Sequence, residues 1–179
     1  MSILPLREYP DPILHQKAQS VAKIDDEIRL FLDDMLETMY ADRGAGLAAP
    51  QVGVSKRMIV LDAEQKEDED GHHQKGHPMA LINPEIIYKS EEKILFCEGC
   101  LSLPEQRADV ERHQKIKVRY QDTNGSVKEI EAEDYLAVIL QHEIDHLDGI
   151  LYIDHLSRLK REMLLKKLQK AREQKAEKA

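Results

Sequence analysis

Two histidines with a glutamate beside the first are the residues whose spacing points most directly to chemistry in this chain. They lie in residues 141–146, which read QHEIDH. Residues four apart share one face of a helix, so His142 and His146 can hold a single metal ion. Glu143 can then reach water at that ion without binding the ion itself. The alternative, two surface histidines on an acidic helix, is weakened by the apolar residues around the motif.

A catalytic metal site needs a third protein ligand and an open position for water, and the two cysteines are candidates. Cys97 and Cys100 form a CxxC pattern, which also occurs in redox pairs and zinc sites. The sequence contains no second CxxC to complete a structural zinc site. Because residues 101–104 (LSLP) read as extended, the two thiols should face opposite sides of a strand. Only one of them would then meet the metal.

A few helices and strands must position these side chains. We predict amphipathic helices over residues 24–40, capped by Asp25, over residues 134–147, and after Ser157. The predicted strands cover residues 58–61, 79–87 with an interruption at Asn83-Pro84, 93–96, 116–121 and 127–130. Asn124-Gly125 predicts a hairpin turn between the last two strands. Strands and helices without a regular alternation indicate an α+β fold.

Composition limits the class of protein. The 179 residues are enough for one domain, and the 41% of hydrophobic residues are enough for one core. No apolar run approaches the roughly 20 residues of a membrane helix. The chain has no Trp and only two Phe, which argues against an aromatic surface on which the bases of single-stranded nucleic acid could stack. Two cysteines and no signal-peptide pattern lead us to expect a cytoplasmic protein.

Charge is unevenly distributed along the chain. The formal net charge is −8, yet residues 156–179 hold nine Lys or Arg against three Glu. This basic tail indicates contact with an anionic partner, or else a solvated terminal helix. Residues 63–77 form an acidic insertion that we expect to be mobile. Its three histidines (His72, His73 and His77) lie in a segment with nothing to fix the geometry of a metal site.

Three segments together resemble the signature motifs of the peptide deformylase family, and they follow the family's order. They are residues 44–51 (GAGLAAPQ), 98–102 (EGCLS) and 141–146 (QHEIDH). The resemblance implies an α+β fold with antiparallel β-sheets packed around a central metal-binding helix, an N-terminal helix and a C-terminal helix. The resemblance extends from about residue 3 to residue 156, so we expect a deformylase-like catalytic domain over residues 1–156 and, after it, the basic C-terminal helix over residues 157–179. The acidic insertion at residues 63–77 is not covered by the family pattern.

The resemblance further implies how the metal is held. Cys100, His142 and His146 match the family's three ligands, with water in the fourth position. Iron(II) is the ion implied first, and Zn²⁺, Ni²⁺ or Co²⁺ can occupy the same site. Cys97 is outside the family pattern.

The implied reaction removes the N-formyl group from the N-terminal formyl-Met of nascent polypeptides and releases formate. In it, metal-bound water attacks the formyl carbon with Glu143 as general base and then general acid. Gln51 and the backbone N–H of Leu101 match the groups that hold the carbonyl oxygen. Gly46 matches the glycine that lets the backbone of the substrate run close to the backbone of the enzyme.

A pocket for the methionine side chain follows from helix geometry. Val138 and Ile139 lie four and three residues before His142 and share its face of the helix. We expect them to line an apolar pocket, and plain core packing is the alternative.

The expected partners are N-formylmethionyl peptides and, through the basic C-terminal helix, the ribosome, with no membrane contact. Three other functions stay open at this point. A metallopeptidase would use the same two histidines as metal ligands and the same glutamate (the HExxH pattern of residues 142–146), but it would cleave peptide bonds. A non-catalytic ribosome-binding protein would keep the fold, and a redox protein would depend on Cys97.

Overall fold

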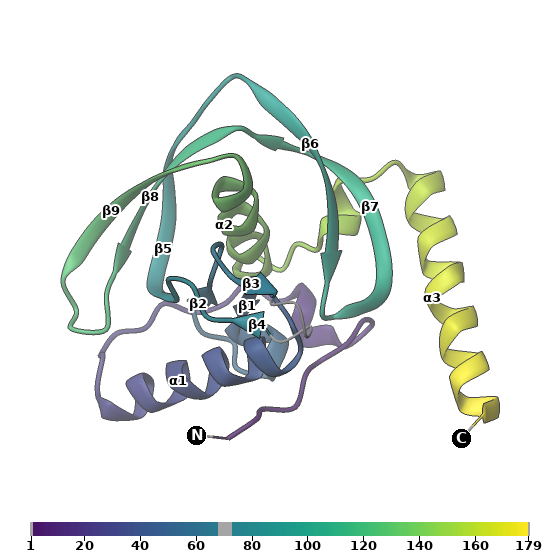
Figure 1. Ribbon diagram of the computed structural model, residues 1–179, viewed down its shortest axis with the longest axis horizontal. Helices are drawn as coiled ribbons and strands as arrows, with labels where there is room; N and C mark the ends of the chain where they lie inside the picture. The colour runs from purple at the N-terminus through teal and green to yellow at the C-terminus, as the bar shows by residue number, and fades with distance from the viewer. Residues whose placement is uncertain (1, 68–72, 179) are drawn as a thin grey trace.

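The helix that carries both histidines, α2 (Asp134–Leu147), runs through the middle of the molecule with strands on both sides (Figure 1). The computed structural model describes residues 2–67 and 73–178. The bounds of α2 confirm the predicted helix, and ten of its fourteen residues are buried. Side chains on such an enclosed helix are held in place by packing, which makes it a rigid base for a site.

A five-stranded antiparallel sheet packs against α2. Its order is β1-β2-β5-β8-β9. The strands are β1 (Gly46–Ala48), β2 (Met58–Leu61), β5 (Met79–Lys89), β8 (Lys115–Gln121) and β9 (Val127–Glu133). The predicted hairpin joins β8 to β9, and Gly125 has a φ of 82°, which glycine adopts without strain. The sheet and α2 share one core cluster, which includes Ile59, Leu81, Val118, Leu140 and Ile144.

Strand β5 continues through Asn83-Pro84, where the sequence predicted an interruption. Asn83 has a φ of 51°, and the pairing of β5 with β8 shifts register between Ile82 and Glu85. The Asn83 side chain accepts a hydrogen bond from the Val21 N–H at 2.8 Å and donates one to the Val21 carbonyl at 2.9 Å. The Asn-Pro pair therefore makes an irregularity inside the strand, because side-chain hydrogen bonds to the neighbouring segment hold the backbone there.

A separate hairpin of β6 (Lys93–Cys100) and β7 (Leu103–His113) lies on the other side of α2 (Figure 1). The sequence predicted half of β6 and missed β7, because most residues of β7 are polar or charged. The register shifts between Gly99 and Cys100, so the irregularity falls at the second cysteine of the CxxC pattern.

Helix α1 (Asp26–Ala41) confirms the predicted amphipathic helix, and Oδ1 of Asp25 accepts a hydrogen bond from the Ile28 N–H at 3.2 Å. The family resemblance had implied a helix at the N-terminus, but α1 does not lie there. Residues 2–25 precede it and include a short 3-10 helix, η1 (Pro12–His15). Backbone hydrogen bonds tie that segment to the body, from Arg7 N–H to the carbonyl of Gln51 and from Tyr9 N–H to that of Ser102.

The acidic insertion is anchored at its base by Asp62, which is 1% exposed. Its carboxylate accepts hydrogen bonds from Tyr40 Oη at 2.7 Å and from the backbone N–H groups of Glu64, Gly76 and His77 at 2.8–3.1 Å. Two short strands follow, β3 (Lys66–Glu67) and β4 (His73–Gln74). Residues 68–72, which include His72, lie outside the described residues, so the expectation of mobility stays untested.

The last helix, α3 (Arg158–Lys178), follows the 3-10 helix η3 (Tyr152–His155) and runs along the outside of β7 (Figure 1). Leu164 and Leu168 are buried in a third core cluster with residues of β7 and η3. The boundary predicted at residue 156 falls just before α3, and the domain division itself stays a prediction. No helix among the described residues is long and apolar enough to cross a membrane.

Candidate active site

Cys100, His142 and His146 place their ligand atoms within 4.8 Å of one another. The histidines come from successive turns of α2, and Cys100 comes from the end of β6. The Cys100 Sγ and His146 Nε2 atoms are 3.3 Å apart. Among the described residues this is the one group of His, Cys, Asp and Glu close enough to share an ion. Cys97 is exposed and does not belong to it.

The donor set of this group fits a divalent metal ion. Thiolate and imidazole are ligands of Fe²⁺, Zn²⁺ and neighbouring transition metals. Burial alone would raise the pKa of Cys100, but the adjacent His146 and His142 lower it well below its usual value. The thiol is thereby favoured in its ligating, deprotonated form.

A buried network of charged side chains holds the ring of His142 on the side of its Nδ1 atom. Nδ1 of His142 is 2.7 Å from Oε2 of Glu98, and Arg112 donates to both oxygens of Glu98 at 2.6 and 3.0 Å. Arg112, which is 4% exposed, also donates to Oδ2 of Asp145 at 2.6 Å, and His155 Nε2 lies 2.7 Å from the same oxygen. Although burial raises the pKa of Glu98, the hydrogen bonds from Arg112 and His142 lower it below its ordinary value.

The sequence had given no role to Arg112, Asp145 or His155. A signal was present for two of them. Asp145 lies inside the histidine motif, and Arg112 lies two residues after Val110, on the same face of β7. That face is buried, and a charged residue there requires a partner of opposite charge.

Glu143 lies next to the first histidine on α2 and is 4% exposed. A Cβ atom added to Gly46 would lie 2.5 Å from Oε1 of Glu143 and 2.8 Å from its Cγ. Gly46 thus leaves the space that the Glu143 side chain occupies. Burial raises the pKa of Glu143 to about 7, against the opposing influence of the histidines. A carboxyl group of this kind can take up and release a proton near neutral pH.

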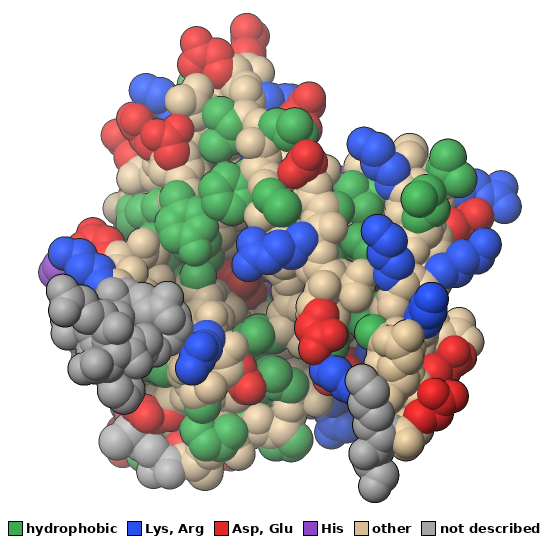
Figure 2. All heavy atoms as spheres, turned by 45° about the vertical axis from the view of Figure 1, so that its right-hand side comes forward, with side chains coloured by type: hydrophobic (Ala, Val, Ile, Leu, Met, Phe, Trp, Pro, Cys, Tyr) green, Lys and Arg blue, Asp and Glu red, His purple; other side chains and the backbone are tan. Residues whose placement is uncertain are grey.

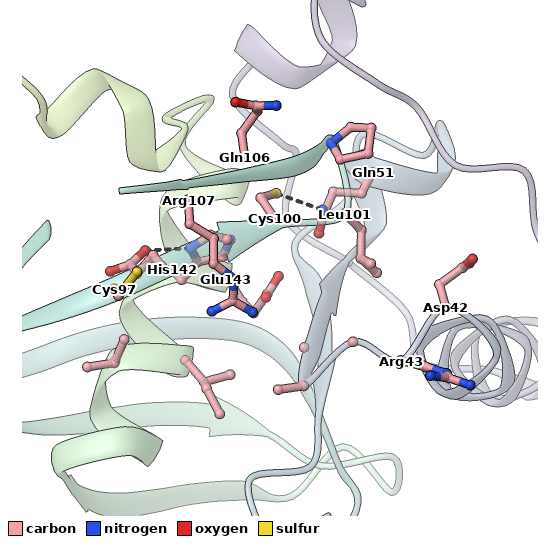
Figure 3. Close-up of a pocket in the computed structure, with 18 of the residues that line it drawn as sticks. Asp42, Arg43, Gln51, Cys97, Cys100, Leu101, Gln106, Arg107, His142 and Glu143 are labelled. Carbon is pink, nitrogen blue, oxygen red and sulfur yellow. Dashed lines mark hydrogen bonds and ion pairs between the residues drawn. The ribbon is translucent and has the colours of Figure 1, made fainter. Parts of the chain in front are cut away.

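Gln51 lies in a short 3-10 helix, η2 (Ala49–Val52), and its amide is held at both ends. Oε1 accepts a hydrogen bond from the Ala48 N–H at 2.9 Å. Nε2 donates to Ser102 Oγ at 3.1 Å. It also donates to Cys100 Sγ at 3.4 Å (Figure 3). Nε2 of Gln51 therefore lies beside the metal group, where it donates to the Cys100 sulfur. Ser102, which the sequence analysis had not singled out, fixes this orientation.

One pocket of about 610 Å³ brings most of these side chains together. The predicted site residues that line it are Gly46, Gln51, Cys100, Leu101, Val138, Ile139, His142 and Glu143. Phe96 and Tyr135 line it too, and their rings stack with centroids 5.5 Å apart. Figure 3 shows Cys100, His142, Glu143 and Gln51 converging from β6, α2 and η2. The cavity is apolar at Val138 and Ile139 and polar at the metal group.

Comparisons with known proteins agree with this geometry. The family described as "Polypeptide deformylase" matches residues 3–162. A peptide deformylase of Zymomonas mobilis is 52% identical over 172 residues, which cover 96% of each chain.

Solved structures show the same fold. A peptide deformylase of Ehrlichia chaffeensis superposes with a TM-score of 0.88 at 42% identity, covering 98% of this chain and 99% of that one. A structure from the same organism in complex with actinonin has a TM-score of 0.86 at 43% identity, covering 96% and 98%. The chain belongs to the peptide deformylase family of metal-dependent hydrolases.

Proposed function

We propose that this protein removes the formyl group from N-terminal formyl-Met of nascent polypeptides and releases formate. The observation that carries the proposal is the convergence of Glu143 and the Gln51 amide on the Cys100, His142 and His146 group. That convergence lies in a pocket with an apolar wall, in a chain whose relatives are peptide deformylases over nearly its whole length.

The metal would be held by Cys100, His142 and His146, with iron(II) as our first choice and Zn²⁺, Ni²⁺ or Co²⁺ as alternatives in the same site. When bound, such an ion acidifies water and polarises a carbonyl group as a Lewis acid. Glu98 holds the ring of His142 through Nδ1, which leaves Nε2 for the ion.

Glu143 moves the proton in this proposal. Its carboxylate takes a proton from the attacking water, whose oxygen forms a bond to the formyl carbon. It then delivers the proton to the methionine nitrogen as the carbon–nitrogen bond breaks. Formate and a free α-amino group result, so one carboxyl group acts as base and then as acid. Its burial beside Gly46 keeps the carboxyl group close to the site of reaction.

Gln51 and Leu101 stabilise the charge that develops on the formyl oxygen. Nε2 of Gln51 already points to the site because Ala48 and Ser102 fix the amide. The backbone N–H of Leu101, which directly follows Cys100, supplies the second donor. One such donor is commonly worth about 3–4 kcal/mol of transition-state stabilisation.

Gly46, Val138 and Ile139 bind the substrate in this scheme. Gly46 has no side chain to block the approach of the peptide backbone. Val138 and Ile139, 2% and 6% exposed, form an apolar wall that suits an unbranched methionine side chain.

The proposal is tested by comparing three peptides that differ at the α-amino group alone: formyl-Met-Ala-Ser, acetyl-Met-Ala-Ser and Met-Ala-Ser. We expect formate from the first and no cleavage of the other two. Cleavage of a peptide bond in any of them would favour a metallopeptidase.

The basic helix α3 is proposed to contact the ribosome, which would bring the pocket to nascent chains in the cytoplasm. Lys166, Lys167 and Lys170 form no ion pair among the described residues and are available for phosphate groups. Co-sedimentation of the full chain with ribosomes at low salt tests this contact.

A further inference from the structure

Charged residues gather at the mouth of the pocket. Arg43 on the loop after α1 and Arg107 on β7 line it, and their guanidinium groups form no ion pair among the described residues (Figure 3). Three acidic residues line the same mouth: Glu8, Asp42 and Glu105. These five side chains alone would leave the mouth with a net negative charge.

Helix α3 reaches two of these acidic residues. Nη2 of Arg172 lies 2.9 Å from Oε2 of Glu8, and Nζ of Lys175 lies 2.7 Å from Oε1 of Glu105. The helix is held in place by other contacts, since Leu164 and Leu168 are buried against the core. Figure 2 shows acidic and basic side chains on both sides of a central hollow, with α3 along one side. The two cations of α3 reverse the sign of the charge at the mouth.

We propose that α3 sets the charge preference of the site, so that it favours formyl-Met peptides with acidic residues after the methionine over peptides with basic residues there. The proposal rests on the deformylase function proposed above. Arg172 and Lys175 neutralise Glu8 and Glu105. Arg43, Arg107 and Asp42 then remain, so that a bound peptide meets a net positive charge at the mouth.

The ion pairs of α3 act on the substrate more than on folding. All four partners are 37–67% exposed, and exposed pairs contribute little to stability. A charged peptide in the mouth nevertheless experiences their summed field, because a cleft concentrates field lines from its walls. Salt should weaken the preference, because the Debye length shrinks to about 3 Å at 1 M salt.

The test uses C-terminally amidated peptides with formyl-Met-Ala followed by Glu, Gln or Lys, and measures kcat/KM by formate release. We expect the full-length protein to favour Glu over Lys by roughly fivefold at low salt, and to lose this preference in 1 M salt. Arg172→Gln/Lys175→Gln should abolish or reverse the preference. Glu8→Gln/Glu105→Gln, which removes the acids instead, should increase it.

A matched control is Lys166→Gln/Lys170→Gln, which removes the same charge from α3 at positions without ion pairs in the described chain. We expect it to keep the wild-type ratio. The inference is overturned if the two α3 double variants change the ratio equally, or if the Arg172/Lys175 variant leaves it unchanged. Failure of the proposed function is distinct, because the uncharged Gln peptide would then release no formate from the wild-type protein.

Discussion

Oε2 of Glu98 lies 2.7 Å from Nδ1 of His142, and this contact fixes the ring of one of the three candidate metal ligands. Glu98 is in turn held by the buried guanidinium group of Arg112. The orientation of His142 therefore depends on Glu98 of β6, which lines the pocket, and on Arg112 of β7, which is not among the lining residues. Partners of this kind set the direction and basicity of a histidine ligand.

Glu98→Gln should weaken metal binding by about 10–100-fold, because the amide holds the His142 ring less firmly than a carboxylate does. The measurement is the apparent Kd for Zn²⁺ by chelator competition. Glu111→Gln is the control, since Glu111 is an exposed β7 residue paired with Lys93. Equal affinities for wild type and Glu98→Gln would show that the contact does not orient the ligand.

Arg112→Met should lower the free energy of unfolding by about 3–5 kcal/mol. It leaves the carboxylates of Glu98 and Asp145 without their shared buried cation. Arg119→Met is the matched control: Arg119 pairs with Glu129 at the surface, and its loss should cost about 1 kcal/mol or less. Urea unfolding of the metal-free proteins measures both values. Similar costs for the two variants would contradict a structural role for the buried network.

Gly46→Ala should displace Glu143, because the added methyl group would overlap its side chain. We expect a loss of formate release together with a lower free energy of unfolding. Combining the change with Glu143→Ala removes the overlapping atoms, so the stability cost of Gly46→Ala should shrink in that background. An unchanged cost in the double variant would mean that the methyl group meets some other atoms.

Asp62→Asn should destabilise the protein by about 1–3 kcal/mol at neutral pH, since Asn replaces a hydrogen-bonded carboxylate. Burial would raise the pKa of Asp62, but the bond from Tyr40 and those from Gly76, Glu64 and His77 lower it below the ordinary 3.8. A lowered pKa stabilises the fold above the unfolded-state pKa, and this contribution is lost as the pH falls through the folded-state pKa. The difference between wild type and variant in urea unfolding should therefore shrink below pH 4. A difference that is constant from pH 7 to pH 3 would contradict this.

Local patterns in the sequence were sufficient for much of the fold. The helices α1 and α2, the hairpin at Asn124-Gly125 and the grouping of His142 with His146 follow from periodicity, caps and turn residues. The choice of Cys100 over Cys97 needed the family resemblance, because spacing alone left both open.

Long-range partners could not be predicted in the same way. Strand β7 carries few apolar residues, so the sequence does not show which of its faces is buried. Arg112 is buried on one face because it pairs with Glu98 and Asp145, which lie on other elements. The contacts of α3 with Glu8 and Glu105 join residues that are 164 and 70 positions apart, respectively. Such contacts depend on how the helices and strands pack against one another, and local patterns in the sequence do not predict that packing.

Glu143→Gln gives the most direct test of the central claim, because it keeps the size of the side chain and removes its ability to carry the proton. Formate release from formyl-Met-Ala-Ser and metal content are measured on the same anaerobically purified samples. We expect about one ion per chain in both proteins, and a loss of at least about 100-fold in kcat for the variant. A variant that keeps its metal and releases formate at the wild-type rate would contradict the claim.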